Sequence, residues 1–174
     1  MPGETSFRPN VDDYIAAARV WYMHALRKPR FSIRLSIITA LVAFGGVLIT
    51  WDDSSLGYRL LFVFGMMAGF LILMTMLMLI SYALLPRRAT RLFRQQRTLE
   101  HDFVFRWDDA GTDTRSDVGT SMIAWTDYHA WAEGRAAFIF FLNDQLYHFI
   151  PKRALSPDQL VDLRTSVQAA RAGG

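Results

Sequence analysis

The sequence predicts a membrane α-helical hairpin of two transmembrane helices, followed by a small cytoplasmic α+β domain. Three observations lead to this prediction: a long apolar run without charge, a shorter apolar run before it, and a change to strand periodicity after both. Hydrophobic residues make up 52% of the chain and charged residues 20%, and these averages combine two very different regions. The chain contains no cysteine, which excludes disulfides and thiolate metal sites.

The longest apolar run, residues 60–85, holds no charged side chain. As a helix rising about 1.5 Å per residue it would reach about 39 Å, enough to cross a hydrocarbon core of about 30 Å with some tilt. A buried helix of a soluble protein would need a larger surrounding core than a chain of this length provides. Residues 60–85 are therefore predicted to be the second transmembrane helix.

A first transmembrane helix is predicted over residues 33–51, with residues 52–59 as an extracytoplasmic loop between the two. Basic side chains lie outside both ends of this hairpin, and only Arg59 lies near its tip. Because basic residues are retained in the cytoplasm, both termini are expected to be cytoplasmic, in a multi-pass protein of the inner (cytoplasmic) membrane. The basic flanks consist of Arg27, Lys28, Arg30 and Arg34 before the hairpin, and Arg87, Arg88, Arg91, Arg94 and Arg97 after it.

The second basic flank belongs to a predicted juxtamembrane helix over residues 86–97. Its arginines satisfy the rule that sets membrane topology, which is the interpretation we favour. The same side chains would also attract anionic lipid headgroups, by about 1 kcal/mol each. The apolar runs 35–51 and 60–85 contain no acidic, basic or histidine side chain, which argues against a proton relay or a transporter core.

Two glycines in the second span, Gly65 and Gly69, form a small-xxx-small pattern that lets another helix backbone approach closely. The favoured partner is the first span of the same chain. The alternative is a second copy of the protein, which would make this surface the seam of a homo-oligomer.

The first 30 residues are predicted to form a short strand, Thr5 to Arg8, and an amphipathic helix over residues 11–28. Asn10 and Asp13 are spaced as a capping box at the start of that helix. Its apolar stripe either packs on the soluble domain or lies in the membrane interface. We favour packing on protein, because Asp12 and Asp13 are unsuited to an anionic membrane surface.

Residues 98–174 are predicted to be the cytoplasmic domain, an antiparallel sheet capped by a C-terminal helix. Alternating apolar side chains begin at Leu99, and turn signals recur at short intervals. Ser156, Pro157 and Gln159 mark the start of the last helix with a capping box and a proline at its first position.

Several short stretches of the chain resemble the YcxB-like membrane proteins. These are the start Val11-Asp12-Asp13-Tyr14, the pair Trp125 and Asp127, and the stretch from Tyr147 through Ile150-Pro151-Lys152-Arg153-Ala154-Leu155-Ser156. The resemblance implies a two-span hairpin with a small cytoplasmic domain similar to bacterial pleckstrin-homology-like folds. It implies no catalytic activity.

The sequence carries no signature of an enzyme, a cofactor site or a metal site, so none is expected. Nucleic acid is not an expected partner, because acids outnumber bases in residues 98–174. No small-molecule substrate is evident. We expect a membrane-anchored interaction or regulatory module that contacts lipid and docks a protein partner. The alternatives are an anionic-lipid sensor, with Lys152 and Arg153 added to the basic rim, and an accessory or immunity-type subunit of a larger membrane assembly.

Overall fold

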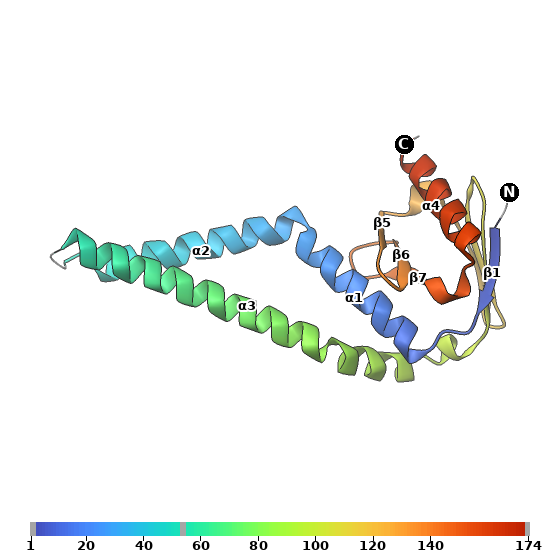
Figure 1. Ribbon diagram of the computed structural model, residues 1–174, viewed down its shortest axis with the longest axis horizontal. Helices are drawn as coiled ribbons and strands as arrows, with labels where there is room; N and C mark the ends of the chain where they lie inside the picture. The colour runs from blue at the N-terminus through green and yellow to red at the C-terminus, as the bar shows by residue number, and fades with distance from the viewer. Residues whose placement is uncertain (1–2, 53–54, 173–174) are drawn as a thin grey trace. The chain divides into compact units, whose positions relative to one another are not determined.

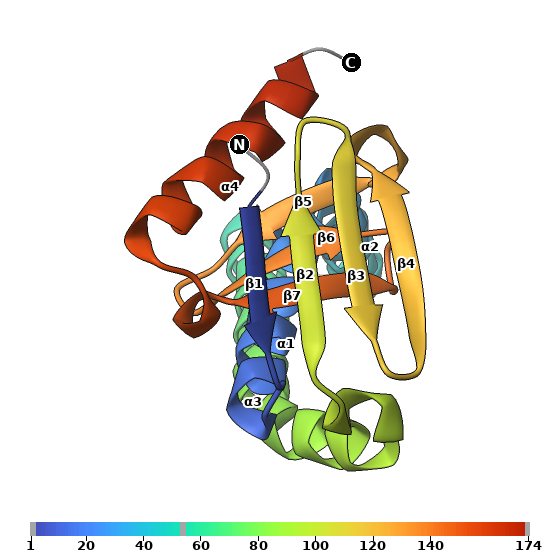
Figure 2. The same cartoon turned by 90° about the vertical axis from the view of Figure 1, so that its right-hand side faces the viewer.

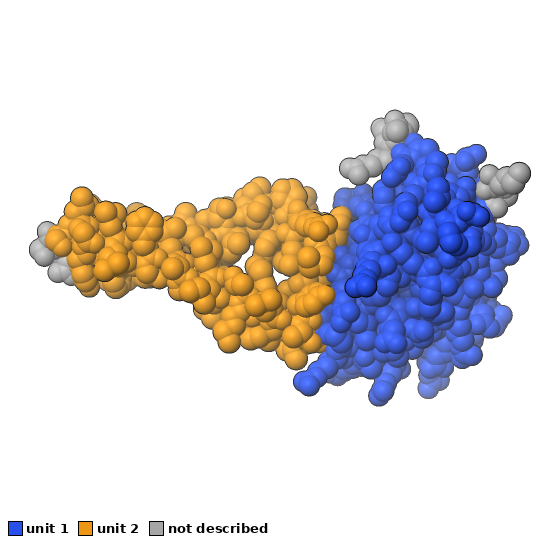
Figure 3. All heavy atoms as spheres, in the orientation of Figure 1, with its two compact units in different colours: residues 1–21, 85–174 blue, residues 22–84 orange. Residues whose placement is uncertain are grey.

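The computed structural model describes residues 3–52 and 55–172 (Figure 1). Asp53 and Ser54 of the expected loop lie outside the described residues, as do Gly173 and Gly174 at the end of the chain. The chain divides into two compact units. Unit 1 comprises residues 1–21 and 85–174, and unit 2 comprises residues 22–84 (Figure 3).

Unit 2 is built from two long apolar helices, α2 (Pro29–Ile49) and most of α3 (Leu56–Gln95). Both are long and apolar enough to cross a membrane, judged by length and composition. The two helices approach each other at Gly46, where a Cβ atom would stand 3.2 Å from the Cγ2 atom of Val63. The α2 helix ends at Thr50, whose hydroxyl donates a hydrogen bond of 2.9 Å to the Gly46 carbonyl.

The α3 helix runs without interruption through Pro86, whereas the sequence suggested one helix over residues 60–85 and another over residues 86–97. A proline removes one backbone hydrogen bond, but the residues on either side decide whether the helix ends there. Here the flanking leucine, arginine and alanine residues are strong helix formers, so the helix continues to Gln95. A 3₁₀ turn, η1 (Arg97–Glu100), then occupies the first part of the expected strand.

Unit 1 contains two antiparallel sheets, which lie one over the other in Figure 2. The first has strands in the order β1-β2-β3-β4 and the second in the order β5-β6-β7. The last helix, α4 (Pro157–Ala172), lies beside β1. The strands are β1 (Gly3–Phe7), β2 (Phe103–Trp107), β3 (Gly111–Ser116), β4 (Gly119–Ala124), β5 (Ala130–Glu133), β6 (Ala137–Phe141) and β7 (Tyr147–Pro151).

Two neighbouring strands of the first sheet are far apart in the sequence. Strand β1 pairs with β2 from Gly3 opposite Trp107 to Phe7 opposite Phe103. All of α1 (Val11–Arg27), α2 and α3 lies between these two strands in the sequence. The apolar hairpin is therefore an insertion into the sheet domain, and residues 98–174 alone lack one strand of that domain.

The core lies between the two sheets and α4. Phe105 and Trp107 of β2 meet Phe140 of β6, and α4 contributes Leu163 and Val167. Strand β6 is buried along its whole length, as expected for a central strand covered on both faces.

The other face of the second sheet is covered by the first part of α1. The Tyr14 ring lies 6.0 Å from the Phe149 ring between centroids, and Ala17 is fully buried. A Cβ atom on Gly134 would stand 2.0 Å from the Cγ2 atom of Val20. This part of α1 therefore packs on protein, as favoured from the sequence.

Candidate functional site

Two of the predicted lipid contacts, Lys152 and Arg153, form ion pairs within unit 1. The Lys152 ammonium hydrogen-bonds the Glu133 carboxylate and lies 5.1 Å from the centroid of the Phe138 ring. Arg153 donates from Nε to Oδ1 of Asp13 at 2.8 Å and from Nη2 to the Arg8 carbonyl at 2.8 Å. Headgroup binding through these two side chains would first have to break those pairs.

Glu133 of β5 is the centre of a small charged cluster with Lys152 and with Arg164 from the middle of α4. Arg164 donates to both of its oxygens, at 3.1 Å and 2.9 Å from Nε, while Lys152 pairs with Oε1. Hydrogen bonds from Arg164, and then from Lys152, outweigh the opposing effect of burial and lower the pKa of Glu133 to about 2. The cluster joins β5, the turn after β7 and α4, so it stabilises the fold.

The basic residues at the end of α3 are arranged differently. Leu85 and Ala89 are buried on one side of this helix, while the arginine side chains are exposed. Over residues 3–52 and 55–172, the structure shows no side-chain hydrogen bond or ion pair for Arg87, Arg88, Arg91, Arg94 or Arg97. These five residues, here called the α3 arginines, are available to bind an external anion.

The remaining predicted residues lie in unit 2. Arg27, Arg30 and Arg34 are exposed and Lys28 is half-buried, near the junction of α1 and α2. Nothing stands within 4 Å of the position that a Cβ atom would take on Gly65 or Gly69. The α2 helix contacts α3 through Gly46. The first span and a second copy both stay predictions for the partner of Gly65 and Gly69.

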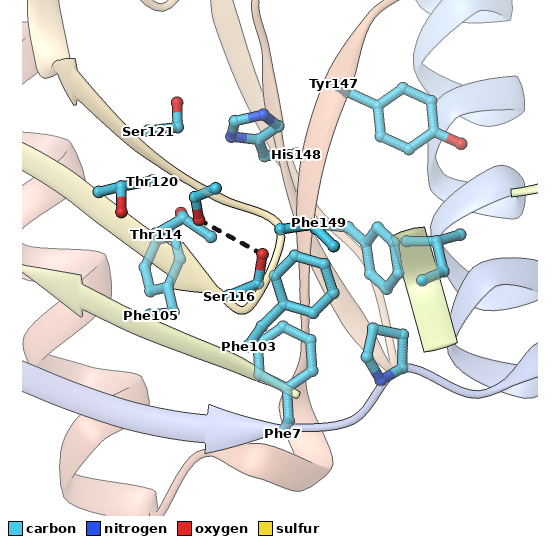
Figure 4. A pocket seen from close by; sticks show the side chains of 14 residues that line it. Phe7, Phe103, Phe105, Thr114, Ser116, Thr120, Ser121, Tyr147, His148 and Phe149 are labelled. Carbon is cyan, nitrogen blue, oxygen red and sulfur yellow. Dashed lines mark hydrogen bonds between the residues drawn. The ribbon is translucent and has the colours of Figure 1, made fainter. Parts of the chain in front are cut away.

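A pocket of about 330 Å³ lies in unit 1 between the first sheet and β7, near the turn that joins β3 to β4 (Figure 4). No motif in the sequence predicted this pocket. Aromatic side chains gather at one end of the pocket and hydroxyl groups at the other. The aromatic end includes Phe7, Phe103 and Phe149, and the hydroxyl end includes Thr114, Ser116, Thr120 and Ser121. The ring of Phe105 lies at the hydroxyl end, because Phe105 is opposite Thr114 in the β2–β3 register.

His148 lies at the hydroxyl end of the pocket (Figure 4). It is opposite Phe140 in the β6–β7 register, so its ring is on the sheet face that points towards the core. The Nδ1 atom of His148 is buried and makes no hydrogen bond within the described part of the chain. Burial lowers the pKa of His148, so the imidazole is neutral at pH 7.

Strand β3 carries a sequence signal that would have suggested a hollow. Thr112, Thr114 and Ser116 alternate along this strand on the inward face, where a fully packed strand would carry apolar side chains. Thr112 is buried and shares a hydrogen bond of 2.6 Å with the Tyr128 hydroxyl. Thr114 and Ser116 line the pocket. The depth of the pocket depends on the distance between the two sheets. Short-range sequence patterns do not specify that distance.

The acidic turn between β2 and β3 has a structural role. Oδ1 of Asp108 accepts hydrogen bonds from the backbone N–H groups of Ala110 and Gly111, at 2.8 Å and 3.0 Å. Among the residues that the structure describes, no group of three or more His, Asp or Glu side chains is placed to hold a metal ion.

Comparison with known proteins identifies one family. The model of the YcxB-like protein family matches residues 107–165, from the end of β2 into α4. This match confirms the resemblance to YcxB-like proteins over that region. The chain has no significant match among curated proteins or among solved structures.

Proposed function

We propose that this protein, which carries a YcxB-like region over residues 107–165, is a membrane-anchored, non-enzymatic interaction module. In this proposal α2 and the apolar part of α3 span the inner membrane. Unit 1 lies in the cytoplasm and docks a protein partner. The role as a docking module is supported chiefly by one unprotected strand edge, described below.

Membrane anchoring is supported by the exposure of the apolar helices. In the most apolar 18-residue stretch of α2, only 6% of the residues are buried. In the corresponding stretch of α3, no residue is buried. Ile49, Leu61 and Ile72 are each at least two-thirds exposed. Apolar surface in water costs about 25 cal/mol per Å², so a soluble protein would bury such helices. A bilayer would cover the same surface, and the basic flanks would keep both termini in the cytoplasm.

A pleckstrin-homology-like fold for unit 1 is part of the proposal. One sheet of four strands, a second of three, and a C-terminal helix beside them are the features that support it. The insertion of the hairpin between β1 and β2 would attach such a domain to the membrane by two helices.

Docking of a protein partner is supported by β4, the edge strand of the first sheet. Edge strands are usually protected by charged residues, proline, bulges or covering segments. The sequence of β4, Gly119–Ala124, contains no charge and no proline, and Met122 is 79% exposed. An extended segment of a partner can add to such an edge through backbone hydrogen bonds. We therefore propose β-strand addition at β4.

A photo-crosslinking amino acid at Met122, in the full chain within its native membrane, tests this proposal. The expected result is one discrete protein adduct that weakens strongly when Ala124→Lys places a charge on the same edge. The crosslinker at exposed Val161 of α4 and the substitution Gln168→Lys serve as controls, which should give no such adduct and no weakening. Equal adducts from positions 122 and 161, or an adduct insensitive to Ala124→Lys, would contradict docking at β4.

An anionic-lipid sensor is the second candidate, because the α3 arginines lack partners within unit 1. At about 1 kcal/mol for each basic residue near an anionic surface, the five would contribute about 5 kcal/mol. We expect slower amide hydrogen exchange over residues 87–97 in nanodiscs of anionic lipid than in zwitterionic ones. The substitution of Arg87, Arg91 and Arg94 by Gln should remove the difference, and substitution by Lys should keep it. The same exchange in both lipids would exclude the sensor.

A further inference from the structure

The pocket between the first sheet and β7, which includes residues of the proposed docking strand β4, has the chemistry of a small-molecule site. Its volume of about 330 Å³ lies within the range of small-molecule pockets, roughly 300–1,000 Å³. Such pockets combine apolar walls with a few polar groups that orient the ligand. Figure 4 shows this combination, with phenylalanine rings at one end and His148 with four hydroxyl side chains at the other.

Among the described residues, no acid, lysine or arginine lines the pocket. The one titratable imidazole, His148, is held neutral by its burial. An ionised group would lose its hydration here without gaining a counter-charge, which is strongly unfavourable. Phosphate, carboxylate and ammonium groups are therefore poor occupants of this pocket.

His148 supplies the specific polar feature. A neutral imidazole has one donor and one acceptor nitrogen, and a buried nitrogen without a partner costs about 1–3 kcal/mol. The Nδ1 atom of His148 is such a nitrogen. A hydroxyl group can donate or accept, so it would satisfy this nitrogen in either tautomer once the half-buried imidazole turns to bring Nδ1 to the cavity.

We propose that this pocket binds an uncharged amphiphile whose apolar body lies among Phe7, Phe103 and Phe149 and whose hydroxyl group pairs with His148. Gly119, Thr120 and Ser121 of β4 line the site, so it adjoins the proposed docking edge. The proposal does not depend on the membrane topology.

Gly119 offers a clean way to fill the pocket. It lines the cavity, its backbone does not have a positive φ, and nothing stands within 4 Å of the position of an added Cβ atom. It lies opposite Ser116 in the β3–β4 register, on the inward face. Gly119→Leu should therefore occupy the hollow without strain, whereas Met122→Leu on the outward face is the matched control.

Three photoreactive probes with one shared ring system test the proposal on the full chain in nanodiscs. They are 4-(hydroxymethyl)benzophenone, the anionic 4-benzoylbenzoate, and 4-methylbenzophenone, which lacks the hydroxyl group. After irradiation, mass spectrometry locates the labelled peptides. Labelling of α2 and α3 from the surrounding lipid provides an internal reference in every sample.

The proposal predicts saturable labelling of β2 and β7 by the hydroxymethyl probe, at least tenfold above labelling by the anion. Gly119→Leu should reduce it at least tenfold and Met122→Leu less than twofold. His148→Phe should reduce labelling by the hydroxymethyl probe about fivefold, which corresponds to the loss of one neutral hydrogen bond. The same substitution should reduce labelling by the methyl probe less than twofold. Equal labelling by the anion, labelling that survives Gly119→Leu, or labelling confined to α2 and α3 would overturn the proposal.

Discussion

Asp13 is the residue that connects the start of α1 most directly to the sheet domain. Its backbone N–H donates to the Asn10 side chain at 2.8 Å, and its carboxylate accepts from the Asn10 N–H at 2.9 Å. The same carboxylate is buried and accepts from Arg153. One side chain thus caps a helix and holds that helix against the turn after β7.

Asp13→Ala should destabilise unit 1 by about 2 kcal/mol, because it removes a helix cap worth about 1 kcal/mol and a charge-assisted bond of similar value. The neighbouring Asp12 is exposed, so Asp12→Ala is the matched control and should change stability by less than about 0.5 kcal/mol. Thermal unfolding of the full chain in detergent measures both. Equal effects of the two substitutions would show that Asp13 acts only as a first-turn charge.

Glu133 gives the domain a defined acid sensitivity. Its pKa is lowered from 4.5 to about 2 in the folded protein, chiefly by Arg164. A lowered pKa means that the stabilisation is complete above about pH 4.5 and is lost as the pH falls towards 2. Because the side chain of the partner Arg164 is 41% exposed, solvent screens the interaction. We therefore expect the ion pairs of Glu133 to stabilise the fold by only about 1–2 kcal/mol.

Glu133→Gln should therefore lower the free energy of unfolding by about 1–2 kcal/mol at pH 7 and by almost nothing at pH 2. Melting the wild type and the variant in parallel across this range measures the difference. A difference that stays constant down to pH 2 would rule out the ion pairs as its source.

At the scale of elements, motifs formed by neighbouring residues were predictable from the sequence, whereas pairings between distant strands were not. The capping box of Ser156 and Gln159 forms as expected, with hydrogen bonds of 2.8 Å and 3.2 Å. Such a motif is contained in four consecutive residues, so the sequence suffices. The pairing of β1 with β2 joins residues on either side of the whole hairpin, and no short pattern specifies it.

The pairing of β1 with β2 can be tested at Gly3, which lies opposite Trp107. A Cβ atom on Gly3 would stand 2.1 Å from the Cε2 and Cζ2 atoms of that indole. Trp107 is 1% exposed and donates from Nε1 to Asp162 at 2.8 Å, so it has little room to move. Gly3→Ala should destabilise unit 1 by about 1–3 kcal/mol through overpacking.

Gly119→Ala is the control for Gly3→Ala, because an added Cβ atom there meets open space. Limited proteolysis of the full chain reports both variants. If Gly3→Ala leaves the protease resistance of residues 103–172 unchanged, β1 is not part of the domain that these residues form.

On the scale of the whole molecule, the account depends on the insertion of an apolar hairpin between two paired strands. If this hairpin spans a membrane, as proposed, it must leave and re-enter the domain on the same side of that membrane. Together with the basic flanks, this arrangement requires β1 and residues 103–172 to share one compartment. Apolar length and charge asymmetry made the hairpin predictable from the sequence, whereas the pocket depends on side chains from β1, β2, β3, β4 and β7 together.

Cysteine labelling tests this topology most directly, because the natural chain contains no cysteine and gives no background. Asp52→Cys places a thiol at the hairpin tip, and Asp109→Cys places one in the exposed β2–β3 turn. With a membrane-impermeant maleimide, the account predicts labelling of position 52 in intact cells and of position 109 only after permeabilisation. Labelling of position 109 but not of position 52 in intact cells, or of both, would contradict a hairpin with cytoplasmic ends.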